Sequence, residues 1–197
     1  EIYTLSLHDA LPICWELESK RWFSLRIGPA EAPFLFKPDG ASQWASTAAE
    51  LLATLAALHA FGWLEETMER KTLEVHLVAG TDNLANQALS TKRSTTKWPL
   101  MAVNMQLSAA LTRARLSLGL QWRPREENTE ADQLTNEEFS GFREDQRVVL
   151  TWSSLELSVL MELVRTRTEF DLARDAAREA AKVAPKLRKG NVDKSPW

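Results

Sequence analysis

Segments with the two-residue period of a β-strand alternate along this chain with segments of helical periodicity, and this alternation limits the possible folds most strongly. Leu73–Val78 and Leu116–Trp122 place apolar residues at every second position, which is typical of a strand with one polar face. Ser46–Phe61 carries leucines at helical spacing among alanines, and a second amphipathic segment runs from Pro99 to about Arg115. Strands that alternate with helices predict an α/β domain with a central sheet.

Shorter elements are predicted around these segments from local pattern and turn chemistry. They are a hairpin over Trp15–Ile27, short strands over Phe34–Phe36 and Val148–Trp152, a short helix between Asn83 and Leu89, a helix from Asn128 to about Leu134, and a long helical region over Ser154–Ala184. Ser46 or Thr47 is the expected N-cap of the first long helix.

Composition limits the class of protein more than its function. In 197 residues, 44% are hydrophobic, so the chain can bury a core. The net charge of −3 gives no basic signature over the whole chain, so nucleic-acid binding would need local patches. Cys14 is the single cysteine, which excludes an internal disulfide and, with three scattered histidines, argues against structural zinc. Apolar runs stay too short to predict a membrane span.

The first residues differ in character from the rest. Glu1–Ile13 reads EIYTLSLHDALPI and resembles the translation of a sequencing adaptor, with Cys14 at the junction. Residues 1–14 are therefore expected to be adaptor-derived, and native sequence is expected to begin near Trp15. The alternative is a natural amphipathic segment, since Tyr3 and Leu5 belong to an alternating pattern.

Three carboxylates stand where strands end or helices begin. Glu50 lies in the first turn of the first long helix, Asp82 follows the strand that begins at Leu73, and Asp132 lies near the start of a later helix. In an α/β sheet, such positions can converge on one crevice. Carboxylate oxygens there would bind Mg²⁺, and a pair of such ions can activate water and stabilise the leaving oxygen of a phosphodiester.

Each of these acids also has a structural explanation. Glu50 completes a capping-box pattern with Thr47. Asp82 before Asn83 is ordinary turn chemistry, and the dipole of a helix favours a negative charge such as Asp132 at its start. The catalytic interpretation therefore depends on all three acids occurring together, in order, within matching elements.

Three strings of the sequence resemble the ribonuclease H-like domain of retroelement polyproteins. Ala79–Asn83 resembles the family's TDN segment after a strand, Trp122–Thr135 resembles its strand, P-x-x-x-N-x-x-A-D and helix pattern, and Thr47–Leu58 resembles the helix that carries its glutamate. The resemblance covers about residues 15–142. It implies a ribonuclease H-like mixed sheet with flanking helices, its first strand missing or replaced, and a C-terminal helical extension.

The resemblance also implies a chemistry. Glu50, Asp82 and Asp132 would be catalytic residues and ligands of Mg²⁺ or Mn²⁺ in an endonuclease that cleaves the RNA strand of RNA–DNA hybrids. The family's fourth acid belongs to the first strand, which the adaptor-like segment replaces, and Asp9 stands too close to Trp15 to substitute readily. Activity is therefore expected to be weak or absent. A reverse transcriptase domain of the same polyprotein would be a partner.

Basic residues near these positions are candidates for phosphate contact. They are Lys92, Arg93, Lys97, Arg123 and Arg125. The alternative for the stretch from Lys92 to Lys97 is a solvated loop. Residues 123–131 lack the histidine that family nucleases often carry near the last acid.

The expected organisation places an incomplete ribonuclease H-like domain at residues 15–142, a helical extension at 143–184 and a basic disordered tail at 185–197. Three other functions stay open. The first is a decayed, non-catalytic fragment or scaffold. The second is an integrase-type strand transferase, against which the N-x-x-A-D match argues, and the third is a mostly helical interaction protein centred on Ser154–Ala184.

Overall fold

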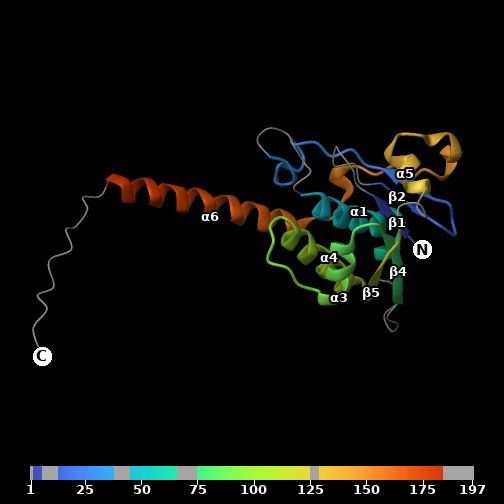
Figure 1. The fold of residues 1–197 in the computed structure, drawn as a ribbon, viewed down its shortest axis with the longest axis horizontal. Helices are drawn as coiled ribbons and strands as arrows, with labels where there is room; N and C mark the ends of the chain where they lie inside the picture. The colour runs from blue at the N-terminus through green and yellow to red at the C-terminus, as the bar shows by residue number, and fades with distance from the viewer. Residues whose placement is uncertain (1, 6–12, 38–44, 66–74, 125–128, 184–197) are drawn as a thin grey trace, which may run out of the picture. The chain divides into compact units, whose positions relative to one another are not determined.

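The computed structural model describes residues 2–5, 13–37, 45–65, 75–124 and 129–183 (Figure 1). Its strands are β1 (Ile2–Leu5), β2 (Ile13–Glu16), β3 (Trp22–Ser24), β4 (Val75–Thr81) and β5 (Leu116–Trp122). Its α-helices are α1 (Ser46–Ala60), α3 (Leu84–Lys92), α4 (Leu100–Ala114), α5 (Thr129–Thr135) and α6 (Ser158–Val183). The chain divides into two compact units, Glu1–Met161 and Glu162–Trp197.

The five described strands form one mixed sheet in the order β3-β2-β1-β4-β5. β1, β2 and β3 pair antiparallel, whereas β1 with β4 and β4 with β5 pair parallel. The parallel pairs place helices in their connections, as such crossovers require. The predicted mixed α/β class is therefore confirmed, as are the hairpin of β2 with β3 and the strand over Leu116–Trp122.

β1 lies within the segment that resembles a translated adaptor. Its backbone occupies the middle of the sheet, where Ile2 pairs with Glu16 of β2 on one side and Thr4 pairs with Thr81 of β4 on the other. Backbone hydrogen bonding makes few demands on side-chain identity, and a short alternating apolar segment satisfies them. The first-strand position is thus filled from residues 1–14.

α1 forms the centre of the core. Alanine and leucine cover its whole circumference, and its residues from Ala48 to Leu58 are all buried. A helix that is apolar all round is covered on every side, and α1 packs against β1, β2, α3 and α4. Small alanine side chains allow this close approach, while Leu52 and Leu55 are fully enclosed.

β2 is covered on both faces. Ile13 and Trp15 pack with Leu134 of α5, and successive side chains of a strand point to opposite faces. Glu16 therefore faces the other side, where its carboxylate accepts a hydrogen bond from Trp63 just beyond α1. The aromatic rings of Phe139 and Phe142 extend the α5 side of this core.

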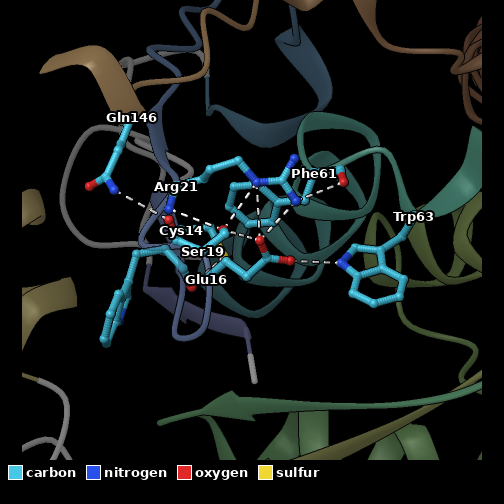
Figure 2. Close-up of polar contacts among 8 residues, drawn as sticks. Cys14, Glu16, Ser19, Arg21, Phe61, Trp63 and Gln146 are labelled. Carbon is cyan, nitrogen blue, oxygen red and sulfur yellow. Dashed lines mark hydrogen bonds and ion pairs between the residues drawn. The ribbon is translucent and has the colours of Figure 1, made fainter. Parts of the chain in front are cut away.

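Glu16 is a buried carboxylate held by a network of donors (Figure 2). Oε2 accepts from Arg21 Nη2 at 2.8 Å and from the hydroxyl of Ser19, and Oε1 accepts from Trp63 Nε1 at 3.0 Å. The same guanidinium donates to the carbonyl oxygen of Phe61 at 3.0 Å. The β2–β3 hairpin is thereby attached to the end of α1.

Two of the short predicted strands are wrong. Phe34–Phe36 overlaps a 3₁₀ turn, Pro33–Leu35, because proline fixes the φ angle at which such a turn begins. In Val148–Trp152, the backbone N–H of Val148 donates to the carbonyl of Trp22 at 2.7 Å, and a 3₁₀ turn starts at Trp152. The expected cap Asn128 and the tail 185–197 lie outside the described residues.

The predicted N-cap is also wrong. Ala45 is the N-cap of α1, and no side-chain cap hydrogen bond is formed there. Thr47 lies inside the first turn, and its hydroxyl accepts from Asn83 instead. A tertiary partner thus replaces the local capping interaction that the sequence pattern favours.

The second unit contains most of α6. Its side chains form ion pairs three or four residues apart, such as Arg165 with Glu162 and Glu169, and Arg167 with Asp171. Such pairs stabilise an exposed helix, and Glu162 has its pKa lowered by the hydrogen bond and charge of Arg165. No helix within the described residues is long and apolar enough to cross a membrane.

The Glu16 network predicts an acid-sensitive stability. Burial raises the pKa of Glu16, but hydrogen bonds from Ser19, Arg21 and Trp63 outweigh it and lower the pKa from its ordinary 4.5. A lowered pKa stabilises the fold above pH 4.5, and this contribution is lost as the pH falls through the folded-state pKa.

We expect Glu16→Gln to cost about 1–2 kcal/mol of unfolding free energy at neutral pH, measured by urea unfolding. This loss is at the low end of what hydrogen bonds to a charged group contribute, because the Arg21 side chain is 39% exposed and solvent screens its charge. The difference from wild type should shrink below pH 4.5. The exposed neighbour Glu18 provides the control, Glu18→Gln; an equal loss in both variants would contradict the assigned network.

Candidate active site

The carboxyl ends of three parallel strands meet at one edge of the sheet. Thr81, the last residue of β4, pairs with Thr4 of β1 on one side and with Trp122 of β5 on the other. Chain segments that leave these strand ends therefore begin close together, which is where α/β proteins commonly place their ligands. Asp82 is the first residue after β4 and stands at this edge.

Asn83 fixes the turn that carries Asp82. Its side-chain oxygen caps α3 by accepting from the backbone N–H of Ala85 at 2.9 Å and of Asn86 at 3.3 Å. Its side-chain amide donates to Thr47 Oγ1 on α1 at 3.3 Å. A single side chain thus starts α3 and joins it to the first turn of α1.

Glu50 is buried at the same junction. Its side chain stands on α1 with 7% of the residue exposed, and its Oε2 accepts from Asn86 Nδ2 at 3.4 Å. The same amide donates to the carbonyl oxygen of Thr47 at 3.2 Å. The capping-box interpretation of Glu50 is therefore wrong, because its carboxylate faces α3 and no side chain caps α1.

Asp82 is half-buried, and its Oδ1 atom is inaccessible to solvent. Its backbone carbonyl accepts from Trp122 Nε1 at 3.2 Å, while the backbone N–H of Arg123 donates to Thr81 at 2.9 Å. The end of β5 is therefore fastened to the turn between β4 and α3. We call Glu50, Asp82 and the residues that join them, Thr47, Asn83 and Asn86, the carboxylate corner.

Asp132 reaches the sheet from a different element. α5 packs against β1 and β2, the two strands beyond β4. Asp132 is half-buried, and its Oδ2 accepts from Asn136 Nδ2 at 3.5 Å, one helical turn later. Asn136 belongs to the same segment as Asp132, whereas Glu50 contacts Asn86 of α3, the helix that follows Asp82.

Within the described residues, no three His, Cys, Asp or Glu side chains gather in a group that could hold a metal ion. Carboxylates fit Mg²⁺ in kind, because hard oxygen ligands are what this ion prefers. One or two carboxylates with waters and substrate phosphates are enough for Mg²⁺, so Glu50 and Asp82 suit it, but Asp132 forms no group of three with them among the described residues. Asp9, the acid nearest the missing fourth position, lies outside the described residues.

The predicted phosphate contacts fall in two places. Lys92, Arg93 and Lys97 are exposed at and beyond the C-terminal end of α3. Asp82 precedes the N-terminal end of that helix, so its nine residues separate them by roughly 13 Å. The backbone of Arg123 lies beside Thr81, the residue before Asp82, and Arg125 lies outside the described residues.

Sequence reasoning missed Asn86, the residue that contacts both Thr47 and Glu50. An asparagine inside a short polar helix is usually exposed, and a three-residue spacing from Asn83 is a weak signal. Its burial, with 1% of the residue exposed, follows from packing between α3 and α1, which local pattern does not reveal.

Asn86→Ala should loosen the carboxylate corner. The change removes two hydrogen bonds of a buried side chain, one of them to a carboxylate, so we expect a loss of about 1–3 kcal/mol in unfolding free energy, measured in urea. Gln87→Ala, at the next helical position, should change stability by less than about 0.5 kcal/mol. Equal stability of the two variants would show that the Asn86 contacts contribute nothing.

Comparisons with known proteins give no assignment. No protein-family description matches the chain, and neither a curated protein nor a solved structure is significantly similar to it.

Proposed function

We propose that the chain derives from the ribonuclease H-like domain of a retroelement polyprotein and is an impaired form of a metal-dependent endonuclease. The substrate is the RNA strand of an RNA–DNA hybrid, whose wide minor groove and 2′-hydroxyl groups distinguish it from DNA. In the parent polyprotein, the partner is a reverse transcriptase domain.

The observation that carries this proposal is the carboxylate corner. Glu50 and Asp82 are 32 positions apart in the printed numbering, yet both stand at the α1–α3 junction, linked through Asn86 and Asn83. The mixed sheet with flanking helices and the order Glu50, Asp82, Asp132 are in keeping with the family resemblance. The backbone of Arg123, one of the predicted phosphate contacts, bonds to Thr81 directly before Asp82.

Mg²⁺ or Mn²⁺, when bound, would activate water and neutralise the leaving 3′ oxygen. Glu50 and Asp82 would supply the oxygen ligands. Asn83 and Trp122 fix the backbone of the turn that carries Asp82. We expect impairment because β1 reads IYTL and carries no acid, whereas the family resemblance places its fourth acid on the first strand.

The second candidate is a non-catalytic decayed fragment, or a scaffold domain, with the same fold. The lack of an acid on β1 favours it as well. The two candidates differ in metal dependence, since a scaffold gains neither stability nor activity from Mg²⁺ or Mn²⁺, whereas binding to the folded state alone raises stability by mass action.

Cleavage of an end-labelled RNA–DNA hybrid tests the proposal. We expect slow cutting of the RNA strand that requires Mg²⁺ or Mn²⁺, with no cutting of a DNA duplex of the same sequence. Asp82→Asn should lower the rate by at least the roughly 10–100-fold that loss of an outer-shell partner costs a metal site. Asp145→Asn removes an exposed carboxylate paired with Arg143 and should leave the rate unchanged.

Two results would overturn the nuclease proposal. One is a cleavage rate that Asp82→Asn does not alter, which would assign the activity to a contaminant. The other is absence of cleavage together with no rise in thermal stability in either metal, which would establish the scaffold alternative.

A further inference from the structure

A cavity of about 560 Å³ lies between α3, α4 and the edge strand β5. Its volume is within the range of roughly 300–1,000 Å³ that is usual for small-molecule sites. None of the described carboxylates Glu50, Asp82 and Asp132 lines it, so it is distinct from the proposed nuclease site. The cavity is therefore a separate feature that the endonuclease chemistry does not use.

Leucines line the cavity from three elements, beside polar residues such as Ser108 and Thr112 of α4. Leu89 comes from α3, Leu107 and Leu111 come from α4, and Leu116 and Leu120 come from β5. Four of them are buried, with 5–6% of each residue exposed, and Leu111 is half-buried. A hydrocarbon chain placed against Leu111 and the exposed edges of the other leucines would remove apolar surface from water, which favours binding by about 25 cal/mol for each Å² removed.

Two arginines line the same cavity. Arg93 ends α3 and Arg115 ends α4, and both residues are exposed. Both occupy the left-handed region, with φ of 57° and 54°, a conformation in which helix ends usually carry glycine. Part of their effect is structural, because a positive charge stabilises the C-terminal end of a helix. Because both guanidinium groups belong to the lining of one cavity, they also favour an anion there.

The open edge of β5 adds hydrogen-bond donors. Arg123 donates its backbone N–H to Thr81, which sets the alternation along β5 and directs the N–H of Leu118 and Leu120 away from β4. The backbone N–H of Leu120 donates a hydrogen bond to the hydroxyl of Ser90 at 3.4 Å. Leu118 and Ser90 both line the cavity, so this edge supplies polar groups as well as leucines.

We propose that this cavity binds an amphiphilic carboxylate of the medium-chain fatty-acid class. The hydrocarbon chain lies on the leucines, and the carboxylate lies between Arg93 and Arg115, where guanidinium groups form charge-assisted hydrogen bonds. A neutral ligand of the same length makes the apolar contacts alone. The function goes beyond the proposed nuclease activity and does not depend on it.

Isothermal titration calorimetry with octanoate, below its micelle concentration, tests the proposal on the full chain. We expect saturable binding of one octanoate and at least tenfold weaker binding of 1-octanol. Arg115→Ala should weaken the binding of octanoate at least tenfold and leave the affinity for 1-octanol unchanged. Arg113→Ala is the matched control, since this arginine stands on the same helix, pairs with Glu156 and does not line the cavity.

Leu111→Trp fills the half-buried side of the cavity and should abolish binding of both ligands, with circular dichroism confirming that the variant folds. Absence of saturable binding, equal affinity for octanoate and 1-octanol, or equal losses in Arg115→Ala and Arg113→Ala would each overturn the proposal. Displacement of octanoate by an RNA–DNA hybrid would assign the cavity to nucleic acid and would overturn it as well.

Discussion

Hydrogen bonds from Asn83 and Asn86 to the start of α1 are the contacts on which the proposed chemistry depends. They hold the first turns of α1 and α3 together, and they bring Glu50 and Asp82 to the edge where β1, β4 and β5 end. Parallel strand pairing places the carboxyl ends of β1, β4 and β5 together, but it does not by itself bring α1 and α3 into contact. Burying a carboxylate is costly unless hydrogen-bond donors contact it. The side-chain amide of Asn86 is one such donor to Glu50.

Several features of the fold follow from local pattern and could be predicted. The strand over Leu116–Trp122 and the helix that begins at Ser46 occur as expected, because their periodicity is strong over many residues. Failures occur where a distant partner outweighs a local preference. The Thr47 hydroxyl accepts a hydrogen bond from Asn83 and does not cap its helix. The backbone N–H of Val148 donates to the carbonyl of Trp22, and no strand forms there.

The placement of Glu50 and Asp82 could be predicted, because connection rules bring strand ends and helix starts together. Their role as site residues stays a prediction, and Asp132 does not join them in a group of three possible ligands among the described residues. Asn86 could not be found in this way, because its role depends on how α3 packs against α1. Nor could the sequence show that residues 2–5 would pair in the middle of the sheet, since pairing of β1 with β4 spans more than seventy residues.

Paramagnetic broadening by Mn²⁺ in a two-dimensional NMR spectrum tests most directly whether the carboxylate corner binds a metal ion. If Glu50 and Asp82 share an ion, low Mn²⁺ concentrations should first broaden the amide signals of residues around Asn83 and Thr47, and an excess of Mg²⁺ should restore them. Asp82→Asn should remove the effect. Broadening that is uniform over the protein, or that centres on the exposed acids of α6, would contradict the assignment of a metal site to this corner.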